Sequence, residues 1–297
     1  MARNPKNFPK QVLFSILKIA FGVFIGFGVL LILVQNAMIY HPSDYSPGVV
    51  DDFVEEGIVS LEFETNQGRQ HAYWFRPAST EGAPSEELPP DTVWIAFGGN
   101  ASRALVWADF LKLHRDSSIG FLLVEYPGYG DCEGSPSPTS ILDNTTSAVT
   151  ALSGHFQWPE QEIREKLALL GHSLGAAAAL QAAEHYGVTR IVLISPFTSL
   201  KAMAVRVVTP IYAPLVRHRW DNVARLETLE GLKGANVAIV HGIDDIEIPI
   251  TMSRELAERF PGMVSLEEVP NLGHNDLFYG ASETILARIS AFSSDSP

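Results

Sequence analysis

The longest hydrophobic run of the chain lies close to its N-terminus. Between residues 12 and 34 the only charged side chain is Lys18, and Ile19–Val34 consists of apolar residues and glycine alone. Extended to Ile39, the run is about 20 residues long, which is enough for a helix to cross the ~30 Å hydrocarbon core of a bilayer. The pattern therefore predicts a transmembrane anchor over residues 12–39.

The charges that flank this run are unequally distributed. The basic side chains that precede it or lie at its start are Arg3, Lys6, Lys10 and Lys18. The segment that follows has no lysine or arginine before Arg69 but carries Asp44, Asp51, Asp52, Glu55 and Glu56. The positive-inside rule then places residues 1–11 in the cytosol and the main domain on the periplasmic, lumenal or extracellular side. A cleaved signal peptide is the alternative, but the run is long for an h-region and no small-x-small cleavage pattern follows it, which favours a signal anchor.

After a linker at residues 40–56, short β-rich runs alternate with longer helical patterns over residues 57–297. The expected strands are Ile58–Thr65, Gln70–Phe75, Thr92–Phe97, Ile119–Glu125, Lys166–Leu170, Arg190–Ile194, Val237–Val240 and Val264–Glu268. The expected helices are Arg103–His114, Ile141–Phe156, Leu174–Tyr186, Met252–Arg259 and Asp276–Phe292. A polar, proline-containing stretch at Ser79–Asp91 is predicted to be a loop. This alternation predicts an α/β fold with a mainly parallel central sheet and helices on both faces.

The sequence Gly171-His172-Ser173-Leu174-Gly175 is a G-x-S-x-G motif in an informative setting. An apolar run at Leu167–Leu170 precedes it, and an alanine-rich run at Ala176–Ala183 follows it. This order predicts a strand, a sharp turn and a helix, which is the context of a nucleophile elbow. The turn would force Ser173 into a strained conformation and expose its hydroxyl, while the two glycines would permit close approach of strand and helix.

A serine hydroxyl needs a histidine to remove its proton and a carboxylate to orient that histidine. Reactive groups in this architecture lie at the carboxyl ends of strands. The strand predicted at Val237–Val240 leads to Asp244 and Asp245, and the strand that follows leads to His274. The chain order serine, aspartate, histidine is the order of this fold class, and one of the two residues Asp244 and Asp245 would be the acid. Asp244 can instead serve as a turn cap.

A third strand end supplies a candidate site for stabilising a negatively charged oxygen. The predicted strand Thr92–Phe97 runs into Gly98-Gly99-Asn100, a glycine-rich turn that exposes backbone N–H groups. Such groups can donate to the oxyanion of a tetrahedral intermediate, and the loss of one donor typically lowers the rate by ~10²–10³.

Taken together, these motifs resemble the α/β-hydrolase superfamily, and more narrowly the single-span, membrane-anchored ABHD-type serine hydrolases with a small lid. The residues that carry the resemblance are Tyr126–Gly130, Gly171–Ala176, Ser195–Ser199, His241–Pro249 and Gly273–Asp276. The resemblance places the catalytic acid on Asp245 and the oxyanion donors on the N–H groups of Leu174 and Asn100. One departure is that Gly98-Gly99 stands where such proteins usually have His-Gly, which bears on the conformation of this loop.

Other reactive side chains are interpreted as structural. His172 and His241 lie beside the motifs and are expected to support them rather than act as bases, and Tyr126–Gly130 is expected to be a turn without chemistry of its own. Cys132 has no partner motif and, as the only cysteine, cannot form an intrachain disulfide. Metal-ligand spacings, G-x-G-x-x-G and P-loop motifs do not occur in the sequence, so we expect no metal and no cofactor.

The charge of the chain is acidic overall but reversed locally. The net charge is −13, and without the four cations of the anchor the remainder carries 17 basic and 34 acidic residues, which argues against nucleic acid as a partner.

The expected lid, at about residues 198–234, holds Lys201, Arg206, Arg217, Arg219 and Arg225 among apolar residues that include Trp220. Either Arg217, Arg219 and Trp220 face a membrane or an anionic substrate, or the apolar residues pack on the core and the arginines are solvated.

These observations predict a membrane-tethered serine hydrolase that cleaves carboxylic esters or thioesters of acyl, lipid-like substrates through an acyl-enzyme. A serine peptidase or amidase with the same triad is one alternative, and a non-catalytic membrane scaffold is another.

Two further features of the sequence have more than one interpretation. Gly22 and Gly26 have the spacing of helix-pairing motifs and could support self-association, and Asn144-Thr145-Thr146 is a glycosylation sequon that would be used only in a eukaryotic lumen.

Overall fold

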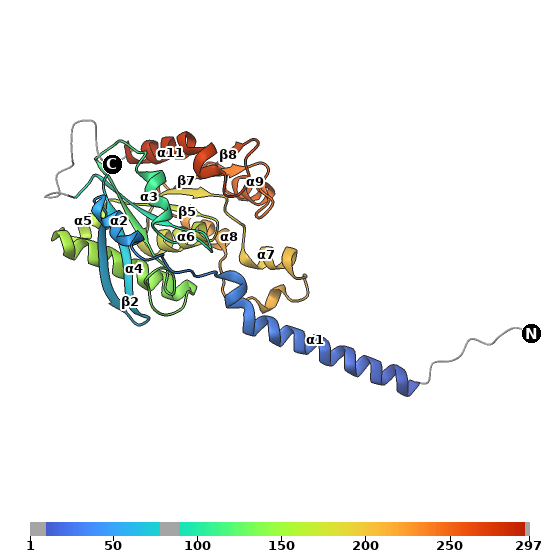
Figure 1. Ribbon diagram of the computed structural model, residues 1–297. Coiled ribbons are helices and arrows are strands. Elements are labelled where there is room, and N and C mark those ends of the chain that lie inside the picture. Colours follow the sequence, from blue (N-terminus) through green and yellow to red (C-terminus); the bar gives the residue numbers. More distant parts are fainter. Residues whose placement is uncertain (1–9, 78–88, 295–297) are drawn as a thin grey trace, which may run out of the picture.

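The fold is built on one mainly parallel β-sheet, as a computed structural model shows for residues 10–77 and 89–294 (Figure 1). Within those ranges the sheet has eight strands in the order β1-β2-β4-β3-β5-β6-β7-β8. The strands are β1 (Val59–Thr65), β2 (Gly68–Phe75), β3 (Thr92–Phe97), β4 (Ile119–Val124), β5 (Leu167–His172), β6 (Arg190–Ile194), β7 (Asn236–Gly242) and β8 (Val264–Val269). Strand β2 is antiparallel to both of its neighbours, and all other pairs are parallel.

Helices cover both faces of the sheet, and each face has its own hydrophobic cluster. Alternate residues of β3 point to opposite faces, with Ile95 and Phe97 in one cluster and Trp94 and Ala96 in the other. The first face is covered by α4 (Pro138–Phe156), α5 (Glu160–Glu165), α6 (Leu174–Tyr186), α8 (Asn222–Glu230) and α9 (Ile250–Arg259). The second is covered by α2 (Val49–Glu55), α3 (Val106–Leu111), α10 (Leu277–Gly280) and α11 (Ser282–Ser294). The predicted α/β class is therefore confirmed, because strands buried on both faces need this two-sided cover.

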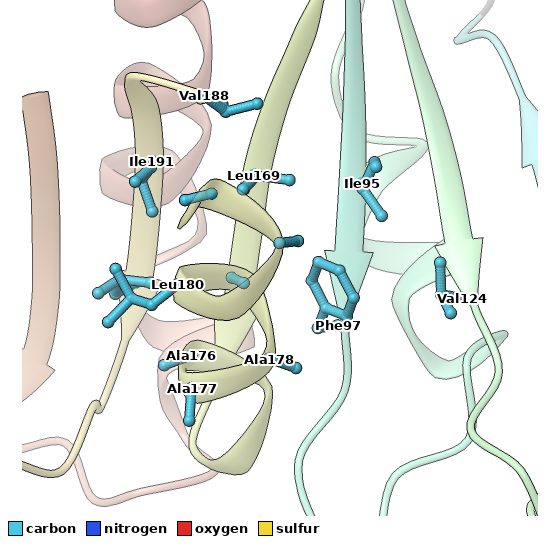
Figure 2. Close-up of a cluster of buried hydrophobic side chains, with 14 of the residues drawn as sticks. Ile95, Phe97, Val124, Leu169, Ala176, Ala177, Ala178, Leu180, Val188 and Ile191 are labelled. Carbon is cyan, nitrogen blue, oxygen red and sulfur yellow. The ribbon is translucent and has the colours of Figure 1, made fainter. Parts of the chain in front are cut away.

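Helix α6 packs closely on the centre of the sheet through small side chains (Figure 2). Two glycines make this approach possible. A Cβ added at Gly175 would lie 2.1 Å from the carbonyl oxygen of Phe97, and one added at Gly171 would lie 2.2 Å from that of Gly175. No larger residue fits either position without displacing the backbone. The helix therefore begins directly behind β3 and β5, at the carboxyl ends of both strands.

The structure differs from the predicted elements in several places. The expected linker contains α2, α5 was not predicted, and the expected last helix is divided into α10 and α11 at Ala281. The segment expected to be a lid holds α7 (Leu200–Val207), the 3-10 helix η1 (Ala213–Leu215) and α8. Helix α8 belongs to the core layer, because Leu226 and Leu229 are completely buried. Of the loop expected at Ser79–Asp91, residues 79–88 lie outside the described residues.

Helix α1 (Lys10–Ile39) projects from the domain (Figure 1). It is long and apolar enough to cross a membrane, and most of its side chains are exposed. Its buried residue, Gly28, lies against the side chains of Tyr212 and Leu215, which belong to the segment between α7 and α8. The end of the helix nearest the domain is therefore in contact with the expected lid.

The asparagine of the glycosylation sequon Asn144-Thr145-Thr146 is not accessible in the folded domain. Asn144 is completely buried in α4, and its side-chain Nδ2 donates a hydrogen bond to the carbonyl oxygen of Glu125. An oligosaccharide cannot be attached to this side chain while the domain is folded. The sequon arises from the helix sequence and does not mark an accessible loop.

Candidate active site

Ser173 occupies the turn between β5 and α6. Its backbone has φ 57° and ψ −118°, an uncommon combination for a residue other than glycine. The N–H of Ser173 donates to the carbonyl oxygen of Ile194 at 2.9 Å, which ties the strained turn to β6. Only 8% of the residue is exposed, and this part borders a cavity. The sequence thus folds locally into the geometry of a nucleophile elbow.

Asp245 and His274 come from the loops that follow β7 and β8. Their closest atoms are Oδ2 of Asp245 and Nδ1 of His274, 2.6 Å apart, and each residue is 6% exposed. The two loops can meet because of Gly242, where an added Cβ would lie 2.3 Å from the carbonyl oxygen of Leu272. Parallel pairing of β7 and β8 places both loops at one edge of the sheet, beside the elbow.

The carboxylate of Asp245 is surrounded by hydrogen-bond donors. Its Oδ1 accepts from the backbone N–H groups of Glu247 at 2.9 Å and Ile248 at 2.8 Å. Its Oδ2 lies 3.1 Å from Nε2 of His241, in addition to the contact with His274. Burial alone would raise the pKa of Asp245, but the hydrogen bonds from His241, His274 and Ile248 lower it well below the usual range. Asp245 is therefore ionised at neutral pH.

The tautomer of His241 follows from its partners. Its Nε2 faces two acceptors, the carbonyl oxygen of Ile248 at 2.9 Å and Oδ2 of Asp245, so this nitrogen carries the proton. Its Nδ1 accepts from the hydroxyl of Ser253 at 2.6 Å. His241 is fully buried and does not border the cavity. It supports the carboxylate from behind. Asp244, the alternative acid, is exposed and contacts neither histidine.

His172 packs against His274 with ring centroids 4.7 Å apart. Its Nε2 donates to the backbone carbonyl of His274 at 3.2 Å, while its Nδ1 is buried without a hydrogen-bond partner. Burial, followed by the proximity of His274, lowers the pKa of His172 to about 3. The ring is therefore neutral at ordinary pH and can serve to hold the backbone of His274.

The glycine-rich loop after β3 approaches the elbow from the opposite side. The N–H groups of Asn100 and Leu174 donate to no acceptor within the described residues. Two tyrosines fix the loop, because Tyr126 donates from its hydroxyl to the carbonyl of Gly98 at 2.8 Å and Tyr129 donates to that of Asn100 at 2.5 Å. These tyrosines were expected to form a turn without chemistry. Their hydroxyls were the missed signal, because a buried phenol usually finds a hydrogen-bond partner.

Gly98 stands where the resembling proteins usually carry histidine. A Cβ at this position would lie 3.1 Å from Cβ of Ser102 and 3.2 Å from its carbonyl oxygen. The tight turn between Gly99 and Ser102, closed by a hydrogen bond of 3.1 Å, leaves no ordinary room for a side chain there. Glycine is thus the residue that this version of the loop accommodates best.

Four of the candidate residues border one cavity of about 290 Å³, whereas Asp245 does not border it. Ser173, Leu174, Asn100 and His274 border it at one end, and α7, the η1 segment and the last turns of α1 border the rest. Among the described residues no hydrogen bond joins the hydroxyl of Ser173 to His274. Such contacts are often long in unliganded enzymes and tighten when substrate binds. The wall is mainly apolar, which suits an acyl chain better than a polar substrate.

The two arginines and the tryptophan of the expected lid lie in different environments. Arg217 and Arg219 are exposed but do not border the cavity. Trp220, expected to face substrate or membrane, is instead 1% exposed, and its Nε1 donates to the hydroxyl of Tyr40 at 3.0 Å. The membrane- or substrate-facing alternative is therefore wrong for Trp220, and the alternative of packing on the core holds, because the indole packs inward where the chain enters α8.

The remaining candidate for nucleophilic chemistry is Cys132. It is buried, and burial followed by the charge of Glu125 raises the pKa of its thiol far above the usual range. The thiolate, which is the reactive form, is therefore suppressed. In residues 10–77 and 89–294 no cluster of three His, Cys, Asp or Glu side chains is arranged to hold a metal ion.

Comparison with known proteins agrees with this architecture. The chain matches the alpha/beta hydrolase family over residues 93–263, and it belongs to that family. It is 28% identical over 242 residues to an uncharacterised protein of Mycobacterium tuberculosis, covering 82% of this chain and 81% of that one. It is 25% identical over 278 residues to YfhR of Escherichia coli, covering 92% and 89%. An uncharacterised membrane protein of Saccharomyces cerevisiae is 27% identical over 171 residues, covering 55% and 57%.

Solved structures show the same fold at low sequence identity. An alpha-beta hydrolase from Vibrio vulnificus superposes with a TM-score of 0.62 at 18% identity, covering 86% of this chain and 90% of that one. The Pyrococcus furiosus esterase PF2001 gives 0.59 at 16% identity, covering 87% and 97%. The thioesterase domain from the curacin biosynthetic pathway gives 0.56 at 13% identity, covering 79% and 99%. The chain thus has the fold of hydrolases that include an esterase and a thioesterase.

Proposed function

We propose that the protein is a membrane-tethered serine hydrolase that cleaves carboxylic esters or thioesters of acyl, lipid-like substrates. One observation carries this proposal. His274, which is hydrogen-bonded to Asp245, borders the same apolar cavity as Ser173, and Ser173 sits in a strained elbow. A buried, ionised carboxylate bonded to the Nδ1 of a histidine leaves Nε2 as the basic nitrogen, directed toward the cavity.

The proposed reaction begins when Nε2 of His274 removes the hydroxyl proton of Ser173 and Oγ attacks the acyl carbonyl carbon. The resulting oxyanion accepts hydrogen bonds from the N–H groups of Leu174 and Asn100, for which the described residues offer no other acceptor. The imidazolium, stabilised by Asp245, then protonates the leaving alcohol or thiol as the bond to the acyl carbon breaks. An acyl-serine remains. Water, deprotonated by His274, attacks it in a second cycle and releases the carboxylic acid.

The preference for esters and thioesters is supported by the apolar cavity and by the activities named for two structural neighbours, an esterase and a thioesterase. A peptidase or amidase would use the same three residues. Amide cleavage needs stronger protonation of the leaving nitrogen, and no feature of this cavity favours it over ester cleavage.

Membrane tethering is proposed from α1 and from the yeast relative that is described as a membrane protein. Flanking basic residues favour a cytosolic N-terminus and a hydrolase domain on the periplasmic, lumenal or extracellular side. The anchor would hold the cavity beside the bilayer that contains the substrates.

Hydrolysis of three matched decanoyl substrates, an ester, a thioester and an amide, tests this function. The full-length protein in vesicles should turn over the ester and thioester at least 100-fold faster than the amide, and Ser173→Ala should abolish all turnover. A dominant amidase rate would favour the peptidase alternative. Turnover of none of the three by folded protein would favour a non-catalytic scaffold.

A further inference from the structure

One wall of the cavity beside Ser173 is formed by the apolar N-terminal helix. Leu31, Gln35, Met38 and Ile39 of α1 border the cavity together with the candidate catalytic residues. These positions differ by four, three and one residues, so they lie on one face of the helix. The same face therefore cannot be covered by lipid where it closes the cavity. Helix α1 is a structural part of the site, in addition to any role as a tether.

The segment between α7 and α8 reaches along α1 to the level of its apolar run. The ring of Tyr212 stacks on Phe24 at 5.0 Å between centroids and meets the edge of Phe27 at 5.1 Å. The hydroxyl of Tyr212 donates to the carbonyl of Phe24 at 3.2 Å. Phe24 precedes Gln35 by eleven residues, or roughly 16 Å along a helix. Tyr212 thus lies alongside the apolar run and not beyond its end.

Helix α7 and the segment that follows it expose apolar side chains that nothing in the described chain covers. Val205, Val207 and Ile211 are 40%, 70% and 65% exposed. Val207 also borders the cavity, so the apolar surface continues from the outside into the site. Lys201 and Arg206 are exposed on the same helix, α7. Apolar residues next to basic ones are the pattern of a surface that lies in the interface of a bilayer with anionic headgroups.

We infer that the acyl chain of a bilayer lipid enters the site sideways, between α1 and the segment from α7 to η1. The ester or thioester carbonyl reaches Ser173, and the chain lies against Leu31 and Tyr212 with its far end directed along α1 toward the hydrocarbon. This inference rests on the proposed function and specifies its substrate class: an acyl ester or thioester that is presented from the membrane and not from water.

The size of the cavity restricts how much of such a lipid can be enclosed. A volume of about 290 Å³ is at the lower end of the ~300–1,000 Å³ range that is usual for ligand pockets. Part of one acyl chain therefore fits in the cavity. Longer chains are accommodated because the remainder stays in the bilayer beside α1.

Two substitutions on neighbouring positions of α1 test the inference. Leu31→Trp places an indole in the cavity, whereas Leu33→Trp adds the same bulk at a residue that is 75% exposed and does not border the cavity. Each full-length protein is reconstituted in phosphatidylcholine vesicles. We measure kcat/KM for p-nitrophenyl acetate in water and for a palmitoyl thioester in the vesicles, and we use the ratio of the two values. Labelling by a fluorophosphonate reports separately on Ser173.

We expect Leu31→Trp to lower the palmitoyl-to-acetate ratio at least tenfold and Leu33→Trp to leave it within twofold of the wild type. If the wild type is labelled and hydrolyses both substrates but the ratio of Leu31→Trp is unchanged, the wall formed by α1 is not part of the route and the inference is overturned. An equal loss in Leu33→Trp would assign the effect to the bilayer and also overturn it. Absence of labelling in the folded wild type would overturn the proposed function, and this inference with it.

Discussion

The side chain of Asn100 donates a hydrogen bond from Nδ2 to the carbonyl oxygen of Ile39, at 3.2 Å. In return, the N–H of His41 donates to the carbonyl oxygen of Asn100, at 2.9 Å. The candidate oxyanion loop is therefore joined directly to the end of α1. A residue whose backbone N–H is proposed to hold the oxyanion takes its orientation partly from the helix proposed to lie in the membrane.

Removing the hydrogen bond from the side chain of Asn100 to Ile39 should lower the reaction rate more than the stability of the fold. We expect Asn100→Ala to lower kcat for a soluble ester roughly tenfold, because the donor loop loses one restraint while its N–H is retained. The free energy of unfolding should fall by about 0.5–1.5 kcal/mol, the usual net value of one hydrogen bond. Steady-state kinetics and denaturant titration measure the two effects. Asn66→Ala, in an exposed turn, is the control, and a loss of kcat equal to the control would contradict the role of Asn100.

Asp244 and Asp245 are adjacent in the chain, so the same substitution at each position allows a direct comparison of their roles. Asp245→Asn should lower kcat by roughly 10³–10⁴-fold, because the amide cannot stabilise the imidazolium of His274 or hold its tautomer. Asp244→Asn should leave kcat within twofold, since the side chain of Asp244 is exposed and contacts neither histidine. Measuring kcat with one soluble ester decides between them. The opposite ranking would move the acid to Asp244.

His172 should make the domain sensitive to acid. Its pKa is lowered to about 3 in the folded state from an ordinary 6.5, so between these values the unfolded chain binds the extra proton. Stability is then lost as pH falls below about 6.5, by up to ~1.4 kcal/mol per pH unit. His172→Gln keeps a donor for the carbonyl of His274 and does not titrate. Its denaturant-unfolding free energy should fall less steeply than the wild-type value between pH 6.5 and 4.5.

Glu125 contributes a pH dependence of the opposite sign to the free energy of unfolding. This contribution cancels when the wild type is compared with His172→Gln. Burial raises its pKa to about 7 from an ordinary 4.5, although hydrogen bonds from Tyr45 and Ala104 lower it in part. The folded state therefore binds the extra proton, and this contribution to stability is lost as pH rises through 4.5–7. Both proteins contain Glu125, so the difference between their slopes reports on His172. If the unfolding free energies of the two proteins changed with pH in parallel, His172 would be protonated in the folded domain as it is in the unfolded chain.

Close approach of α6 to the sheet predicts a further contrast between two glycines. Gly175→Ala should destabilise the domain by about 3 kcal/mol or more, because its Cβ would overlap the carbonyls of Phe97 and Gly98. Gly154→Ala, in α4, has open space around the added Cβ and should stabilise by up to ~1 kcal/mol. Thermal denaturation of both variants checks the sign of each change. A mild effect at Gly175 would contradict the elbow geometry.

Much of the fold and the core of the site could be predicted from local patterns. The elbow at Ser173 was indicated by the strand–turn–helix pattern around it, and the order of Asp245 and His274 along the chain agreed with the fold class. Spacing alone did not separate Asp244 from Asp245. Burial and contact with His274 distinguish them in the structure.

The parts that escaped prediction depend on contacts between distant segments. Apolar residues of the lid could either pack inward or remain exposed, and periodicity does not distinguish the two. In the structure Trp220 packs inward on Tyr40, whereas Val207 is exposed at the edge of the cavity. The contact of Tyr212 with Phe24 joins residues 188 positions apart. Gly22 and Gly26 have open space around them, so self-association of the anchor stays a prediction.

Ser173 is proposed to be an activated nucleophile, and a fluorophosphonate probe, which reacts covalently with such serines, can measure this activation. Wild type, Ser173→Ala and Asp245→Asn would be compared as full-length proteins in solubilised membranes. We expect rapid labelling of the wild type, none of Ser173→Ala, and strongly slowed labelling of Asp245→Asn. A folded wild-type protein that is not labelled, or a Ser173→Ala variant that is labelled equally well, would contradict the proposal.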